Sequence, residues 1–157
     1  MHRDAFTDLL ASGAALFQQN ARLLTLRFAE GSGLGPEVLL PHEVEGEEGL
    51  SRGFVYQLDC LSADMHLELK EVLGQPIELG ILLPEGGERL LTGIVTRAEQ
   101  LGADGGFAKY RLRIEPALAI LGHRRNSRVF QDQTVLEMVQ TILDEHLAAN
   151  PVLAASF

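Results

Sequence analysis

The sequence predicts a mainly β protein: an antiparallel β-barrel or strongly curved sheet of about six strands, flanked by a C-terminal helix. Several segments alternate apolar and polar residues, as strands with one buried face do. Glycine-containing connections of hairpin length separate these segments, which favours antiparallel pairing over βαβ units. An amphipathic segment with its own capping motif follows the last alternating segment and predicts the helix.

The first part of the chain predicts a weak helix and a loop before the main run of strands. Asp4–Phe17 is weakly amphipathic and contains Gly13, so residues 1–20 are expected to form a flexible or short helical segment. Gly31–Pro36 is rich in glycine and predicts a loop. The expected strands are, in chain order, Arg22–Phe28, Val38–Glu48, Phe54–Leu61, Pro76–Leu83, Glu88–Leu101 and Phe107–Ile114.

Two connections between these strands can be specified further. The Asp104-Gly105 pair predicts a tight hairpin turn, because both residue types tolerate the positive φ that such turns require. Leu67–Leu73 has the pattern of a short helical turn, which is expected to end at Gly74.

The alternation also places charged residues on the faces of the predicted strands. One acidic set shares a face of the second strand, which is therefore expected to be a solvated edge. Another set lies opposite the apolar face of the last strand and is expected to be solvated or to meet a partner. The sets are Glu43, Glu45 and Glu47 on the second strand and Arg111, Arg113 and Glu115 on the last.

The C-terminal helix is predicted from its first residue onward. Thr134 and Glu137 form a capping box, in which each side chain satisfies a backbone amide of the other residue. The following apolar residues recur every three or four positions and form one stripe, which is expected to pack against the outside of the barrel. Asn150-Pro151 ends the pattern. The stripe consists of Val135, Met138, Val139, Ile142, Leu143 and Leu147.

Length, charge and cysteine content narrow the function classes. A chain of 157 residues is expected to form one domain with its own core. The formal net charge of −9 argues against sequence-independent binding of nucleic acid, which depends on cationic side chains. Cys60, the single cysteine, lies on the apolar face of an alternating segment and is predicted to be a buried structural thiol.

No segment predicts insertion into a membrane or cleavage of a signal peptide. The apolar runs are shorter than a membrane-spanning helix requires. Asp4 and Asp8 lie where a signal peptide would carry positive charge. The protein is therefore expected to reside in the cytoplasm, unless it leaves by a route that needs no cleaved signal.

The catalytic and metal-binding patterns in the chain are weak. Gly49–Gly53 fits G-x-S-x-G, the nucleophile elbow of α/β-hydrolases, with Ser51 in the nucleophile position. That elbow requires a helix after the serine, whereas the following residues alternate as a strand, so no catalytic role is predicted. The five histidines have no second ligand at metal-binding spacing, so neither a metal site nor a cofactor is predicted.

A basic cluster stands out in this acidic chain. Arg124, Arg125 and Arg128 lie between the last strand and the C-terminal helix, where their guanidinium groups could bind carboxylates of a neighbouring protein. Such a cluster can also bind phosphate or RNA, and in the remaining interpretation the arginines pair locally with carboxylates such as Asp132. The candidate interface therefore comprises Arg124, Arg125, Arg128 and Asp132.

A series of short motifs follows along the chain: Gly46–Arg52, Phe54–Leu58, Leu73–Pro76, Gly93–Thr96, Tyr110–Leu112 with Pro116, and Arg128–Asp132. In order and spacing this series resembles the N-terminal part of VgrG proteins, the spike proteins of the bacterial type VI secretion system. The resemblance extends over Leu23–Leu147. Two departures occur: Gly53 replaces the family's usual proline, and Ala117–Ala119 replaces aromatic residues expected after Pro116.

The resemblance implies a structural protein rather than an enzyme. The N-terminal region of VgrG resembles the tail hub of contractile phages and is built from small β-barrels. The full-length protein is expected to form a homotrimer that sits on the Hcp tube, carries effector or adaptor proteins and leaves the cytoplasm through the secretion system. Residues 21–131 would form the β-barrel hub domain, and residues 132–157 the helix that starts the next, truncated hub subdomain.

Two other function classes stay open at this point. One is a serine hydrolase that uses Ser51, which would need a general base within hydrogen-bond reach of the serine. The other is a generic β-barrel binding module. A module that binds single-stranded nucleic acid would need aromatic side chains beside cationic ones.

Overall fold

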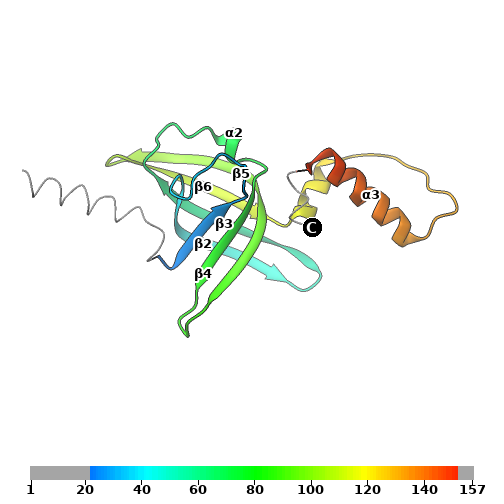
Figure 1. Ribbon diagram of the computed structural model, residues 1–157, viewed down its shortest axis with the longest axis horizontal. Helices are drawn as coiled ribbons and strands as arrows, with labels where there is room; N and C mark the ends of the chain where they lie inside the picture. Colours follow the sequence, from blue (N-terminus) through cyan, green and yellow to red (C-terminus); the bar gives the residue numbers. More distant parts are fainter. Residues whose placement is uncertain (1–21, 152–157) are drawn as a thin grey trace, which may run out of the picture.

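Six antiparallel strands form one curled sheet in the computed structural model, which describes residues 22–151 (Figure 1). The hydrogen-bonded order is β1-β4-β5-β6-β3-β2. The predicted mainly β, antiparallel fold is therefore confirmed, whereas the expected helical segment at residues 1–20 lies outside the described residues. The strands are β1 (Leu24–Phe28), β2 (Leu40–Gly49), β3 (Arg52–Ser62), β4 (Pro76–Leu82), β5 (Glu88–Asp104) and β6 (Phe107–Glu115).

The sheet is a half-barrel rather than a closed barrel. Its two edge strands, β1 and β2, approach each other because the sheet curls, but no strand pairing joins them. One bridge between the edges is the hydrogen bond from Nη1 of Arg22 to the carbonyl oxygen of Pro41, at 3.4 Å. The short helix α2 (Leu69–Val72) precedes β4 and contacts β5, close to the helical turn expected at Leu67–Leu73.

The concave side of the sheet holds the core. Leu58 on β3 and Leu112 on β6 are fully buried and lie directly opposite each other in the ladder. Tyr110 is also fully buried, and its hydroxyl donates to the carbonyl oxygen of Asp64 at 2.9 Å, so the polar end of the ring is satisfied. Cys60 is fully buried as predicted, and desolvation raises the pKa of its thiol far above the usual value.

Close packing on β2 requires a glycine. A Cβ atom on Gly46 would lie 2.0 Å from Cδ1 of Tyr56, its neighbour on β3. The tyrosine ring therefore lies over the bare backbone of β2, and its hydroxyl donates to the Glu48 carboxylate.

The hairpin between β5 and β6 turns one residue later than predicted. Asp104 pairs with Phe107 and belongs to β5, and the two turn residues are Gly105 and Gly106, with φ of 61° and 88°. A two-residue type I′ turn needs positive φ at both central positions, which glycine adopts without strain. Asp104 therefore stays in the strand.

The chain after β6 leaves the sheet. Ala117–His123 forms a 3₁₀ helix, η2, that the sequence pattern did not predict. An extended segment then leads to α3 (Val135–Ala149), which lies apart from the sheet in Figure 1. The capping box is confirmed: Thr134 N–H donates to Oε2 of Glu137 at 2.7 Å, and Glu137 N–H donates to Oγ1 of Thr134 at 3.3 Å. Within the described residues, no helix has the length and apolarity needed to cross a membrane.

The expected packing of α3 on the barrel was wrong. Along the predicted stripe, Val135 is 73% exposed, Val139 47% and Ile142 37%. The reason is the path of the chain: η2 and the following segment carry the helix beyond the end of the sheet, out of reach of its surface (Figure 1).

Candidate interface

The convex side of the sheet carries the charged residues, and we call this side of β2, β3, β6 and β5 the outer face. Because residues directly opposite each other in a ladder share a face, the strand pairing arranges the charges in rows. Two rows cross the outer face from β2 to β5. They are Glu43–Asp59–Arg111–Glu99 and Glu45–Gln57–Arg113–Arg97.

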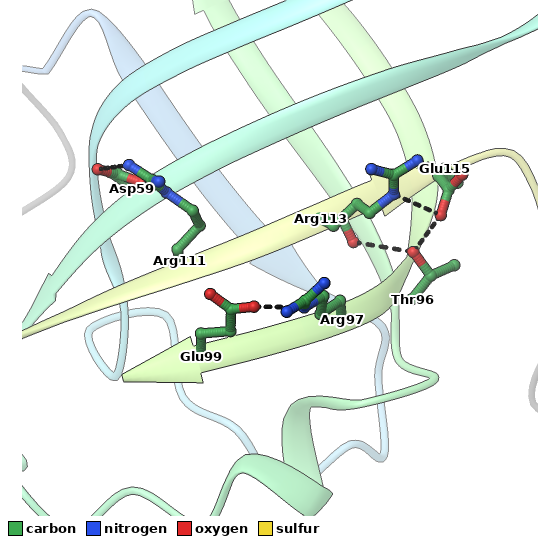
Figure 2. Close-up of polar contacts among 7 residues, drawn as sticks. All are labelled: Asp59, Thr96, Arg97, Glu99, Arg111, Arg113 and Glu115. Atoms are coloured by element: carbon green, nitrogen blue, oxygen red, sulfur yellow. Dashed lines mark hydrogen bonds and ion pairs between the residues drawn. The ribbon is translucent and has the colours of Figure 1, made fainter. Parts of the chain in front are cut away.

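Asp59 lies at the centre of the first row and is covered by two cations. Arg111 donates from Nε and Nη2 to the two carboxylate oxygens, at 2.6 and 2.9 Å (Figure 2). Nζ of Lys109 lies 2.9 Å from Oδ2. The Asp59 side chain is only 6% exposed. The hydrogen bond from Arg111 is the main cause that lowers the pKa of Asp59 to about 2, against the opposing effect of burial.

Arg113 is held by a second carboxylate on the same strand. Its Nε and Nη2 atoms donate to Glu115 at 2.9 and 3.2 Å, and this interaction lowers the pKa of Glu115. Thr96 occupies a bulge of β5, and its hydroxyl contacts the same carboxylate (Figure 2). Glu115 therefore links β5 to β6 and fixes the orientation of Arg113.

Two arginines lie directly opposite each other on the outer face. Arg97 on β5 pairs in the ladder with Arg113 on β6, although Arg97 also forms an ion pair with Glu99. Like charges at opposed ladder positions are destabilising. The side chains surround a shallow hollow of about 260 Å³, lined by Gln57, Arg97, Glu99, Arg111 and Arg113.

The arginine cluster singled out in the sequence lies in the segment between η2 and α3. Arg128 forms an ion pair with Glu145 of α3, with Nη2 and Oε2 at 2.5 Å, and the hydrogen bond from Arg128 lowers the pKa of Glu145. Arg124 also acts electrostatically on Glu145. The segment and the helix enclose a hollow of about 340 Å³, lined by Leu121, Arg124, Asn126, Arg128, Phe130, Ile142 and Glu145.

The other two members of the predicted interface do not join this contact. Asp132 is exposed and has a φ of 55°, and its carboxylate makes no ion pair with an arginine within residues 22–151. Arg125 is exposed. The local carboxylate partner of the cluster is therefore Glu145 rather than Asp132, and Arg125 forms no ion pair within residues 22–151.

Ser51 lies in a strand–turn–strand context. Leu50 and Ser51 form the tip of the β2–β3 hairpin, closed by the Gly49–Arg52 pair, and Ser51 has a φ of 60°. β3 begins immediately after it, so no helix follows to present amides to an oxyanion. Within residues 22–151, no histidine or carboxylate forms a hydrogen bond with the Ser51 hydroxyl.

Sequence reasoning missed the ion pairs and hydrogen bonds that join neighbouring strands on the outer face. The alternation had placed Arg111, Arg113 and Glu115 together, but Asp59 and Arg97 were not recognised as members of the same surface. The polar position of Asp59 between Leu58 and Cys60 was the available signal. Its partners depend on strand order and register, which a single sequence does not specify.

Comparison with known proteins identifies the family. The family model "Phage tail baseplate hub (GPD)" matches residues 47–155. The chain belongs to the phage tail baseplate hub family. It is also similar to curated type VI secretion system spike proteins, so the resemblance to the N-terminal part of VgrG is confirmed.

Two spike proteins of Pseudomonas aeruginosa illustrate this similarity. VgrG1a is 38% identical over 109 residues, covering 69% of this chain, and VgrG1c is 37% identical over 127 residues, covering 81%. This chain spans 17% of the length of each relative. VgrG3 of Vibrio cholerae is 34% identical over 72% of this chain and 12% of its own length.

A solved structure supports the fold assignment. The E. coli c3393 protein is described as a component of the type VI secretion system with structural similarity to the T4 bacteriophage tail proteins gp27 and gp5. It matches with a TM-score of 0.62 and 30% identity, over 76% of this chain and 31% of that chain. The curled sheet is therefore the hub fold of phage-like tails.

Proposed function

We propose that this chain is an N-terminal hub portion of a type VI secretion spike and that its role is structural. The observation that carries the proposal is the match of residues 47–155 to the phage tail baseplate hub family, together with the curled sheet shared with the E. coli c3393 protein. In this role the outer face and the edges of the sheet provide surfaces for assembly.

The proposal extends to the assembly in which the hub works. The complete protein forms a homotrimer, sits on an Hcp-like tube protein and carries effector or adaptor proteins through contraction of the secretion machine. It is cytoplasmic before firing and is exported without a signal peptide. Because the chain spans only a small part of its relatives, the isolated 157 residues are monomeric or weakly associated.

A structural role also fits the surroundings of Ser51. The hairpin tip offers neither a helix N-terminus nor a general base among the described residues, and both are needed by a serine hydrolase of the G-x-S-x-G type. The chemistry delivered by such a spike therefore resides in other domains or in cargo.

The proposed function is tested by release of the tube protein from the bacterium. Deleting residues 22–151 from the complete spike protein should abolish release of the Hcp-like protein into the medium, whereas Ser51→Ala should leave release at the wild-type level. Loss of release with Ser51→Ala in a folded protein would contradict a purely structural role.

The cluster of Arg124, Arg125 and Arg128, with Asp132 nearby, is proposed as one contact surface of this hub. Replacing the three arginines by alanine in the complete protein should leave the sheet folded, because all three lie outside it, and should weaken spike assembly. Lys70→Ala, on the exposed side of α2, is the control. Normal assembly with the triple variant would return the cluster to a local role, with Arg128 holding α3 through Glu145.

A further inference from the structure

Besides the rows that cross the strands, the outer face carries two rows that each run along a single strand, one acidic and one basic. On β2, three glutamates occupy every second position, and all three are exposed. On β6, three cations also occupy every second position, with side chains 41%, 42% and 44% exposed. We call them the acidic row (Glu43, Glu45 and Glu47) and the basic row (Lys109, Arg111 and Arg113).

The acidic row and the basic row have the same spacing between charges, but they lie on strands that are not neighbours in the sheet. Side chains two residues apart on a strand are separated by about 6.8 Å, so three charges in one row can face three charges in the other. Within one chain, β3 separates the rows, because β2 and β6 both pair with β3. Glu45 acts electrostatically on Arg111 across β3, but the two form no ion pair within residues 22–151. Their direct contact therefore requires two molecules.

The basic row is fixed in orientation before any partner arrives. The two arginines each use Nε and Nη2 to bind a carboxylate of the same chain, Arg111 on Asp59 and Arg113 on Glu115. For both side chains, Nη1 makes no hydrogen bond within residues 22–151. Holding a guanidinium in place before binding lowers the entropy lost when it meets a further carboxylate.

The Arg97–Arg113 pair adds an independent indication. Two guanidinium groups are opposed in the ladder of a chain whose formal net charge is −9. Each has a carboxylate partner on its own strand, Glu99 for Arg97 and Glu115 for Arg113, but the opposed positions of the two cations still disfavour the isolated molecule. A carboxylate from outside the chain would relieve the repulsion if it bound above the hollow between these side chains.

We propose that the acidic row of one copy of this chain docks on the basic row of a second copy. This inference rests on the proposed hub function, in which several copies assemble. Because the two rows lie on different strands, the contact joins unlike surfaces, and contacts of this kind close into rings when the rotation allows it. Exposed ion pairs are individually weak and screened by salt, so the isolated chain should associate measurably only at high protein concentration and low ionic strength.

Two charge-reversal variants test the pairing. Glu43→Lys, Glu45→Lys and Glu47→Lys together reverse the acidic row. Arg97→Glu with Arg113→Glu reverses one member of the basic row and the arginine opposite it on β5, and leaves Arg111 on Asp59. Sedimentation velocity at high protein concentration and low ionic strength should show association of the wild-type chain, loss of association in each variant alone, and recovery in their equimolar mixture.

A matched control separates row pairing from general charge effects. Glu30→Lys, Glu37→Lys and Glu85→Lys change the net charge by the same amount at exposed positions outside the sheet ladders. The control reduces overall repulsion and should associate at least as well as the wild type, whereas the acidic-row variant should associate less. Raising the salt should abolish association of the wild-type chain, because the charges are exposed.

The outcomes distinguish this inference from the function on which it rests. Circular dichroism checks that the variants are folded. If the new glutamate at position 113 unfolds the chain by lying beside Glu115, Arg97→Gln with Arg113→Gln takes the place of the charge reversal. A wild-type chain that stays monomeric at low salt, or a mixture that associates no better than its components, would overturn the pairing. Normal release of tube protein by the acidic-row variant would overturn it and leave the hub function intact.

Discussion

The curled sheet and the segment that follows it are stabilised in different ways. In the sheet, residues far apart in sequence share one buried core, and Leu58, Tyr110 and Leu112 on neighbouring strands have no exposed surface. In α3, His146 is the one fully buried residue, and the helix also has its own capping box and the Arg128–Glu145 ion pair. The comparison shows that local signals are enough to specify a helix but not where that helix docks.

The largest expected effect comes from truncating a core side chain of the sheet, and a similar truncation in α3 serves as the comparison. Leu58→Ala should lower the free energy of unfolding by about 3 kcal/mol, because it leaves a cavity between central strands. Ile142→Ala on α3 removes a similar side chain that is 37% exposed and should cost less than about 1 kcal/mol. Urea unfolding of both variants measures the difference. Equal losses would show that α3 packs in solution as tightly as the sheet.

A smaller effect is expected from the charged centre of the outer face. The pKa of Asp59 is about 2 in the folded chain and 3.8 as its ordinary value, so the unfolded state binds the proton more readily. The carboxylate therefore stabilises the fold above pH 3.8, by about 2 kcal/mol at neutral pH, and this contribution disappears as the pH falls through 2.

Asp59→Asn should therefore be less stable than the wild type at pH 7, and the two unfolding curves should converge near pH 2. Asp132→Asn is the matched change in the other region, at an exposed residue with a φ of 55° that asparagine accommodates. It should change stability by less than about 0.5 kcal/mol at any pH. A constant difference between Asp59→Asn and wild type down to pH 2 would show that the Arg111 and Lys109 contacts do not depend on charge.

The smallest effect concerns the helix cap. Thr134→Ala removes the side chain that accepts from Glu137 N–H and should destabilise α3 by about 1 kcal/mol. Amide hydrogen exchange should accelerate in Val135–Ala149 and stay unchanged in β3 and β6, because the helix is not part of the sheet core. Faster exchange in both regions would show that they unfold as one unit.

Much of the fold could be predicted because its signals are local. Alternation located all six strands within a few residues, and the Thr134–Glu137 spacing located the start of α3. The turn was predicted one residue too early, because Asp104 tolerates a turn position much as the glycines after it do. The 3₁₀ helix at Ala117–His123 was missed, since such short helices lack a distinct hydrophobic period.

The candidate interface was harder to predict because it depends on contacts distant in sequence. Glu145, the partner of Arg128, comes later in the chain, within α3, whereas Asp132 is near in sequence but makes no ion pair with Arg128. The need for glycine at position 46 likewise arises from the ring of Tyr56 on the next strand. Strand order and register create these neighbours, and one sequence without its fold does not reveal them.

The buried thiol has a practical consequence for studying this molecule. Cys60 is the only cysteine, lies on β3 between strands on both sides, and has a raised pKa, so a soluble alkylating reagent reaches a reactive thiolate only after the sheet opens. The rate of labelling then measures how often the sheet opens, without an added probe. Neither α3 nor the segment before it contains a cysteine, so the single thiol reports on the half-barrel alone.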